Sequence, residues 1–191
     1  DAFVKWFGWD WKGAEEAFKR TIEINPNYPE ARAQYSQLLA ILKRPEEAIV
    51  QAQRAIELDP FNPVIMGLYG STFSMVGRYD EGMAMAHNEL RMSPNSSLGL
   101  QILWWGHHYK GEYDQALEGA KAFYKAMGLA PIIQIIEEGY ERGGYTEAMR
   151  GAAEAMAFAA QEQYIQPYWL AIQFAIAGEK EKCLDWLEKG Y

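Results

Sequence analysis

The sequence has little cysteine and no long apolar run, and each shortage excludes a class of structure. Cys183 is the only cysteine in 191 residues, so no disulfide can form within the chain. No stretch approaches the ~18 consecutive apolar residues that a membrane-spanning helix needs, so direct membrane insertion is not expected. The single thiol leaves the cellular compartment open, with the cytoplasm favoured.

Basic residues are also few. Lys and Arg number 18 against 26 Asp and Glu, which gives a formal net charge of −8. This sign disfavours nucleic acid or an anionic membrane surface as the main partner, because both carry negative charge themselves. At 49% hydrophobic and 14% aromatic, the chain is too apolar to be disordered.

The common signatures of catalysis and of metal binding are absent as well. The sequence has no Gly-rich phosphate loop, no Gly-x-Ser-x-Gly elbow and no His-Glu-x-x-His string. His107 and His108 are adjacent, and neighbouring side chains on a helix point about 100° apart, so they cannot share one ion from a regular helix. We therefore expect no catalytic residue, no metal site and no cofactor.

What the sequence does contain is a repeat. Pro26, Pro60 and Pro94 are 34 residues apart. The same spacing separates four small residues, Ala14, Ala48, Gly82 and Ala116. It also separates four residues at predicted helix starts, Trp11, Pro45, Tyr79 and Tyr113. A period of 34 residues with small residues, aromatics and prolines in fixed register is typical of a helical repeat array.

Start and stop signals divide the chain into helices. Asp10 and Asn62 are suited to cap helix starts, and Gly77 to end a helix in the left-handed conformation, as Gly111, Gly143 and Gly178 do in later copies. These signals predict twelve helices in antiparallel pairs. They are expected at about 1–7, 11–24, 29–42, 45–58, 63–76, 79–92, 97–110, 113–127, 131–142, 145–161, 165–177 and 180–190. The first reads as the end of a longer helix, so we interpret the chain as a piece of a longer protein.

At these residues the sequence resembles the tetratricopeptide repeat (TPR) family, and more narrowly the TPR segments of bacterial multidomain regulators. The positions that carry the resemblance are Tyr69, Gly70, Phe73, Gly77, Tyr79, Gly82, Ala86 and Pro94; departures are Lys43, Trp104, Phe123 and Ile136. The resemblance implies an all-α fold, a right-handed TPR superhelix or α-solenoid, as a single array over 1–191. Its parts would be a partial repeat 1–28, repeats 29–62, 63–96, 97–128 and 129–163, and a last helix pair 164–191.

In this family the first helix of each pair lines a concave surface. The register places there Gln37, Ser71, Gln101, Trp105, His108, Tyr109, Glu137, Tyr140 and Tyr168. The family's clamp for a C-terminal carboxylate uses Lys and Asn, but the corresponding positions hold Ala33, Gln37, Leu68, Leu98 and Ile102, so this clamp is not expected. An aromatic groove with few cations suits an apolar peptide or a neighbouring helix.

The resulting hypothesis is a non-catalytic protein–protein interaction scaffold that binds a peptide or a partner segment in this groove. Two alternatives stay open. The chain could self-associate as a homodimer, through an exposed terminal helix or the Trp-rich segment 104–109, or the groove could sense a small apolar ligand for a larger regulator.

Overall fold

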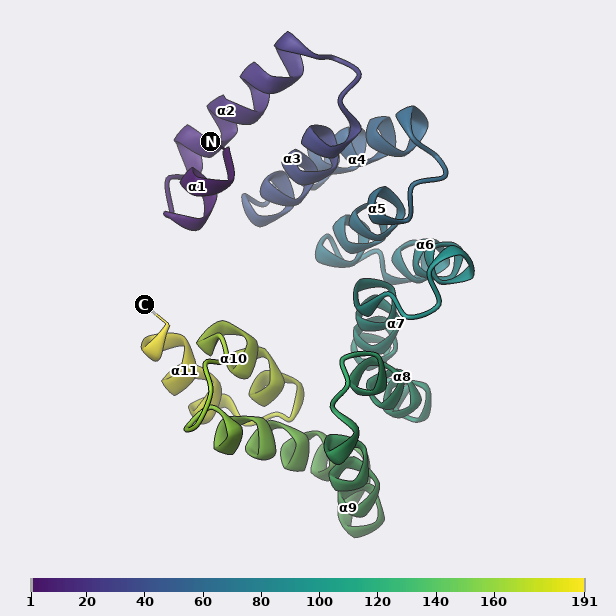
Figure 1. Ribbon diagram of the computed structural model, residues 1–191, viewed down its shortest axis with the longest axis vertical. Coiled ribbons are helices and arrows are strands. Elements are labelled where there is room, and N and C mark those ends of the chain that lie inside the picture. The colour runs from purple at the N-terminus through teal and green to yellow at the C-terminus, as the bar shows by residue number, and fades with distance from the viewer. Residues whose placement is uncertain (1, 191) are drawn as a thin grey trace. The chain divides into compact units, whose positions relative to one another are not determined.

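The computed structural model describes residues 2–190, so that Asp1 and Tyr191, the two ends of the predicted array, lie outside the described residues. Within that range the chain contains eleven helical elements, α1 to α11, and no strand (Figure 1). The chain divides into two compact units, of which unit 1 ends at Lys110 and unit 2 begins at Gly111. Each unit is described by itself below.

Unit 1 is a stack of short helices in which consecutive helices pack side by side. Its helices are α1 (Ala2–Phe7), α2 (Trp11–Ile24), α3 (Pro29–Ile41), α4 (Pro45–Leu58), α5 (Pro63–Met75), α6 (Tyr79–Met92) and α7 (Ser97–Lys110). Besides the pairs α3–α4 and α5–α6, the first helices of successive repeats are in contact, α3 with α5 and α5 with α7. The all-α repeat fold predicted from the 34-residue period is confirmed.

The predicted helix starts follow from capping and from proline. The Asp10 carboxylate accepts a hydrogen bond from the Gly13 amide at 2.9 Å, and the Asn62 side chain accepts from the Val64 and Ile65 amides. A cap of this kind satisfies amides that have no partner within the helix. Proline occupies the first position of α3, α4 and α5, where a missing amide hydrogen costs nothing.

Unit 2 contains α8 (Tyr113–Ala126), α9 (Ala130–Ala159), α10 (Pro167–Ile176) and α11 (Lys180–Lys189). Both predicted helices of this region, 131–142 and 145–161, are present in α9, which consists of two helical segments joined directly at a kink where Gly143 and Gly144 have non-helical backbone angles. Gly144, with φ of 72°, is the left-handed residue rather than the predicted Gly143. The two halves of α9 still pack together, since a Cβ on Gly139 would lie 2.8 Å from Cα of Ala148.

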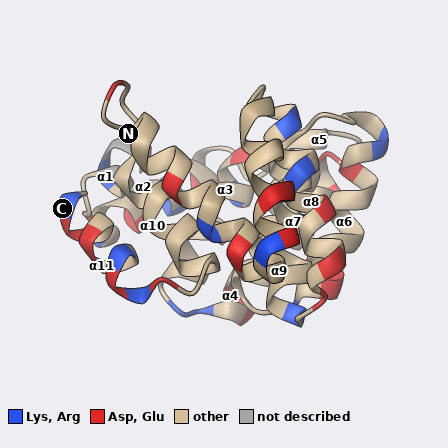
Figure 2. Ribbon diagram, turned by 90° about the horizontal axis from the view of Figure 1, so that it is seen from below, with Lys and Arg blue, Asp and Glu red and all other residues tan. Residues whose placement is uncertain are grey.

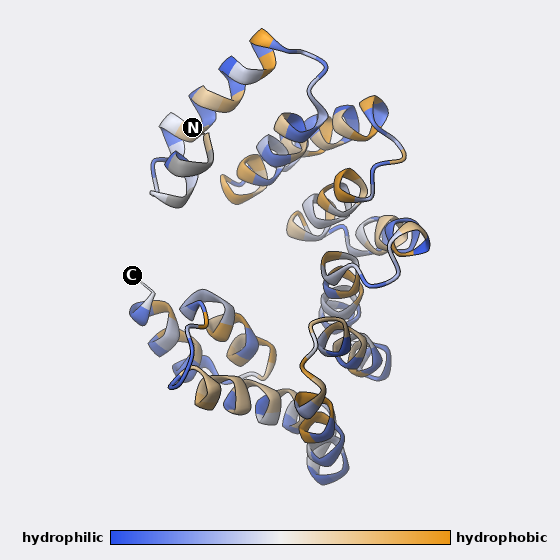
Figure 3. Cartoon of the chain, viewed as in Figure 1, coloured by the Kyte–Doolittle hydropathy of each residue, from blue (hydrophilic) through white to orange (hydrophobic). Residues whose placement is uncertain are grey.

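Small and aromatic side chains make the core of unit 1. Ala48, Ala52 and Ala55, which the sequence predicts on one face of α4, are fully buried. Phe18 and Tyr35 stack with ring centroids 5.8 Å apart, beside Leu38 and Leu39. Figure 3 shows hydrophobic and hydrophilic residues alternating around the helices, as expected for helices that bury one face.

Charged residues of both signs are spread over the helices (Figure 2). Several form pairs within one helix, such as Arg20 with Glu23 and Arg54 with Glu57. Over residues 2–190, none of the helices is both long and apolar enough to cross a membrane.

Replacing Lys43 by glycine is expected to stabilise the protein by about 0.5–1 kcal/mol. Lys43 ends α3 with φ of 60°, the left-handed conformation that Gly77 and Gly111 adopt one and two repeats later. A side chain makes this conformation costly, whereas glycine reaches it without strain. Urea denaturation would show a raised midpoint for Lys43→Gly with an unchanged slope. Lys43→Ala, which keeps a Cβ, is the control, and equal stability of the two variants would contradict the prediction.

Candidate binding pocket

Unit 1 contains a pocket of about 320 Å³ between α5, α6 and α7. Helix α5 contributes Ser71, Ser74 and Met75, the first residue of α6 is Tyr79, and α7 contributes Gln101, Ile102, Trp105, Gly106 and Tyr109. We call these nine residues the α5–α7 pocket. It lies where the first helices of two successive repeats meet.

The repeat explains why a hollow forms there. Ser71 and Trp105 occupy equivalent positions 34 residues apart, as do Met75 and Tyr109. The same register therefore holds a small side chain on α5 and a large one on α7. A serine beside a tryptophan fills less space than two large side chains would, so an unfilled space remains between α5 and α7.

Two tyrosines form one wall of the α5–α7 pocket. The rings of Tyr79 and Tyr109 are stacked, with centroids 5.3 Å apart and an interplanar angle of 12°. The next residue along each helix supplies an ion pair, Lys110 Nζ to Asp80 Oδ1 at 2.6 Å. Stack and ion pair together fix the end of α7 against the start of α6.

A glycine lets α7 approach α6 at the pocket. A Cβ on Gly106 would lie 2.6 Å from Sδ of Met83, a buried residue of α6. Any larger residue at 106 would displace Met83 and open the packing between the two helices. Gly106 therefore keeps the α7 backbone close enough for Trp105 and Tyr109 to line the pocket.

The α5–α7 pocket is uncharged. Among the described residues that line it, polar groups come only from serine, glutamine, tyrosine and the tryptophan ring. The Ser74 hydroxyl is occupied within its helix, donating to the Gly70 carbonyl at 3.0 Å. Such a lining favours an apolar or aromatic group with one or two hydrogen bonds over a charged one.

Four of the residues predicted for the concave surface come together here, namely Ser71, Gln101, Trp105 and Tyr109. Gln37, on α3, is not part of this lining. His108 also lies outside it, half-buried, with its ring 5.1 Å from that of Tyr109. Burial lowers the pKa of His108 below its ordinary value, so the imidazole is neutral at neutral pH.

The other three predicted residues belong to unit 2. The Tyr140 hydroxyl donates to Asp114 Oδ1 at 3.1 Å, which raises the pKa of this tyrosine. Glu137 pairs with Lys121, the carboxylate oxygen lying 3.0 Å from Nζ. Tyr168, in the first turn of α10, is 63% exposed. Tyr140 and Tyr168 thus present aromatic surface, while the Glu137 charge is already paired.

Tyr79, Ile102 and Gly106 also line the pocket, although the sequence did not place them on the concave surface. The sequence prediction assigned the binding surface to the concave side of the first helices, whereas Tyr79 begins a second helix. The repeat register shows only that Tyr79 begins a helix, as Pro45 does one copy earlier. No group of three His, Cys, Asp or Glu side chains within the described residues could hold a metal ion.

Comparison with known proteins identifies the repeat. Residues 10–70 match the family model described as tetratricopeptide repeat. A search of curated proteins finds no match for the chain. Similarity to solved structures, in contrast, extends over nearly the whole chain.

Three of these structures are PilW, YrrB and IFIT1. PilW, a widely conserved type IV pilus biogenesis factor, is 14% identical with a TM-score of 0.68, covering 98% of this chain and 88% of its own. YrrB, a TPR protein with an unusual peptide-binding site, is 13% identical with a TM-score of 0.53, covering 99% and 80%. A monomeric IFIT1 mutant with Gppp-AAAA is 20% identical with a TM-score of 0.59, covering 94% and 46%. At these identities the likeness is one of fold.

Proposed function

We propose that this chain, a tetratricopeptide repeat protein, is a non-catalytic scaffold that binds a peptide or an extended segment of a partner protein. The α5–α7 pocket would receive one apolar or aromatic side chain of that segment. The observation that carries the proposal is an uncharged hollow of about 320 Å³ walled by Trp105, Tyr79 and Tyr109.

The size and chemistry of the pocket suit a single side chain. Ligand pockets for whole small molecules run from about 300 to 1,000 Å³, so this one is at the lower limit. Burying a Leu or Phe side chain contributes about 1.5–3 kcal/mol. Tryptophan and tyrosine are suited to such contacts because they offer large surfaces and lose little rotamer freedom on binding.

The other residues predicted for the concave surface are proposed as additional contacts with the bound segment, in each unit separately. In unit 1 Gln37 and His108 would contact the backbone or flanking residues of the bound segment, beyond the pocket itself. In unit 2 Tyr140 and Tyr168 are proposed as further aromatic contacts. YrrB lends support, since it is described as a TPR protein with an unusual peptide-binding site and has a similar fold.

Selection from a phage-displayed library of random linear peptides tests the proposal. We expect wild-type protein to enrich peptides that share one aromatic or large aliphatic residue. Counter-selection on the Ser71→Leu variant, whose pocket is filled, should remove them. Enrichment that is the same on both proteins would place the binding surface elsewhere. Binding of a small apolar compound that competes with the selected peptides would favour the sensor alternative.

Self-association is the second candidate, because α11 presents an apolar face. Leu184 and Leu187 are 50% and 44% exposed, and none of the described residues Lys180–Lys189 is buried. If these leucines pair two copies, the mass measured by light scattering should rise with concentration toward that of a dimer. A Leu184→Asp, Leu187→Asp double variant should stay monomeric. A monomeric wild type at all concentrations would exclude this candidate.

A further inference from the structure

Unit 1 buries a carboxylate away from the α5–α7 pocket. Glu89, in the last part of α6, is 3% exposed. The other buried polar side chains of the described residues are Ser36, Thr72 and Gln173, which carry no charge. Burying an ionisable group is costly unless it is paired and hydrogen-bonded, so Glu89 requires an explanation.

The pairing of this carboxylate is incomplete. The Ser96 hydroxyl donates a hydrogen bond to Oε1 of Glu89, while the same serine oxygen accepts from the Gly99 amide at 3.3 Å. Oε2 of Glu89 is buried and has no hydrogen-bond partner. One of the two oxygens is therefore hydrogen-bonded within the protein, and the other is buried without a hydrogen bond.

Two glycines make the space for this carboxylate. A Cβ on Gly67 of α5 would lie 2.9 Å from Cδ and Oε1 of Glu89. A Cβ on Gly99 of α7 would lie 2.8 Å from Oε2. The side chain thus fits between the two helices only because neither position carries a side chain of its own.

The preceding repeat fills the equivalent place without any charge. The residues 34 positions before Gly67, Glu89 and Gly99 are Ala33, Ala55 and Ile65, and these three form a buried apolar cluster. The repeat fold therefore accommodates three apolar side chains at these positions, and a charged group is not needed there for packing. Replacing these three by two glycines and a carboxylate brings no packing benefit, which favours a functional reason for Glu89.

A surface pocket leads to this carboxylate. It has a volume of about 490 Å³ and is lined by Pro63, Val64, Glu89, Ser93, Pro94, Asn95 and Ser96. The lining of this Glu89 pocket combines apolar surface from Pro63, Val64 and Pro94 with the one acidic residue, Glu89. None of these described lining residues is basic, so no lysine or arginine of the pocket itself neutralises Glu89.

We propose that the Glu89 pocket binds an alkylammonium group, either the side chain of a lysine in a partner or a free amine. An ammonium is a compact donor that can satisfy the single free oxygen, whereas a guanidinium favours two oxygens, and Ser96 already occupies one. The methylene stem of the ligand would lie against Pro63, Val64 and Pro94, as lysine stems do on apolar surfaces. The acidic net charge of the chain adds a long-range attraction for cations.

The electrostatics agree with this assignment. Burial raises the pKa of the Glu89 carboxyl above its ordinary value, against the lowering effect of the Ser96 hydroxyl. A cation beside Oε2 would stabilise the charged form and reverse this shift. The NMR chemical shift of the Glu89 carboxyl carbon should therefore differ between the occupied and the empty pocket.

The test follows the carboxyl carbon by NMR in protein labelled with ¹³C-glutamate, with the Glu89 Cδ signal assigned by its loss in Glu89→Gln. Titration with n-butylammonium chloride should move this signal, and n-butanol should not. The capped peptide Gly-Gly-Lys-Gly-Gly tests whether a lysine side chain enters the Glu89 pocket. It should move the Glu89 Cδ signal, whereas the analogue with norleucine in place of lysine should not. A response to the free amine alone would identify a small amine as the ligand.

The matched variants separate a site from non-specific attraction. Glu89→Gln keeps the shape of the side chain and should weaken binding at least about tenfold. Glu46→Gln, at an exposed position of α4, should bind as the wild type does. No movement of the Glu89 signal with either amine would overturn the proposal. So would equal affinity of wild type and Glu89→Gln, measured by calorimetry on variants whose circular dichroism is unchanged.

Discussion

Replacing Trp105 by alanine is expected to weaken binding of a pocket-selected peptide at least about tenfold, or 1.4 kcal/mol or more. Trp105 is half-buried and lines the α5–α7 pocket, so its ring would contact the bound side chain. Truncation removes this contact and admits water to the pocket. Tryptophan and tyrosine at the centre of an interface commonly carry a large share of the binding energy.

The neighbouring tryptophan provides a matched comparison. Trp104 is fully buried and is absent from the pocket lining. Trp104→Ala is expected to cost about 3–5 kcal/mol of unfolding free energy, as truncations of buried aromatic residues do. Trp105→Ala should cost much less stability and much more affinity. Two adjacent residues of the same type would thus separate folding from binding.

The Ser71→Leu variant tests the α5–α7 pocket without removing an aromatic ring. The added side chain would fill the hollow beside Trp105, so peptide binding should fall while helicity is retained. Binding by isothermal titration calorimetry and stability by urea denaturation are the two measurements. If both Trp105→Ala and Ser71→Leu bound peptide with wild-type affinity, the pocket would not be the binding site.

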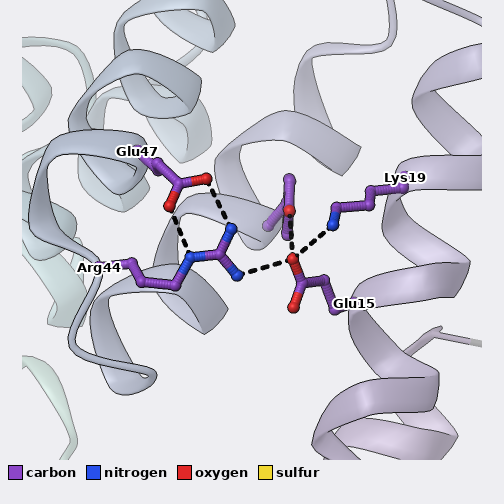
Figure 4. Close-up of polar contacts among 5 residues, drawn as sticks. Glu15, Lys19, Arg44 and Glu47 are labelled. Atoms are coloured by element: carbon purple, nitrogen blue, oxygen red, sulfur yellow. Dashed lines mark hydrogen bonds and ion pairs between the residues drawn. The ribbon is translucent and has the colours of Figure 1, made fainter.

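Lowering the pH is expected to destabilise the protein through Glu15. Its Oε1 lies 2.7 Å from both Lys19 Nζ and Arg44 Nη1, and it accepts a hydrogen bond from the Tyr35 hydroxyl at 3.0 Å (Figure 4). The Arg44 guanidinium is held in turn by both oxygens of Glu47. The network joins α2, α3 and the start of α4.

These donors hold the pKa of the Glu15 carboxyl at about 2, from an ordinary value of 4.5, with Lys19 the largest cause and Arg44 the second. Because the folded state has the lower pKa, the unfolded state binds more protons between these two values. The contribution of Glu15 to stability is thus fully present above pH 4.5 and is lost as the pH falls toward 2. The side chain is 17% exposed, and the contribution is on the order of 2–3 kcal/mol.

Glu15→Gln should therefore be less stable than wild type at neutral pH, and the difference should vanish near pH 2. Glu16→Gln, on the exposed side of the same helix, is the control for the removal of one carboxylate from α2. Urea denaturation at a series of pH values measures both. A constant difference between Glu15→Gln and wild type across this range would show that the pairing adds no pH-dependent stability.

Much of the fold could be predicted because residues that start and end helices recur at the same positions of each repeat. Asn62 with Pro63 marks a helix start, and Gly77 marks a stop, in fixed register with their copies. The predicted stop after Arg142 is present, since the backbone of both following glycines is non-helical, but the positive φ falls on Gly144 and not on Gly143. Which of two adjacent glycines adopts the left-handed conformation depends on how the flanking helices pack, and this is not a local property.

Individual site residues were harder to predict than elements. Trp105 and Tyr109 could be placed on the pocket because they follow Ser71 and Met75 by one repeat. Tyr79 could not, because its stacking on Tyr109 depends on the distance between α6 and α7. Glu89 could not be identified from the sequence alone. A glutamate one repeat after Ala55, together with Gly67 and Gly99, becomes meaningful only when the three are known to touch.

The central claim, that the α5–α7 pocket receives a side chain of a bound segment, is tested most directly by NMR of the methionine methyl groups. Met75 lines the pocket and is 43% exposed, whereas Met149 and Met156 are buried in unit 2. Adding a selected peptide should shift the Met75 methyl signal and produce contacts between that methyl group and the peptide's aromatic or aliphatic side chain. The Met149 and Met156 signals should not move. A peptide that binds without perturbing Met75 would contradict the account.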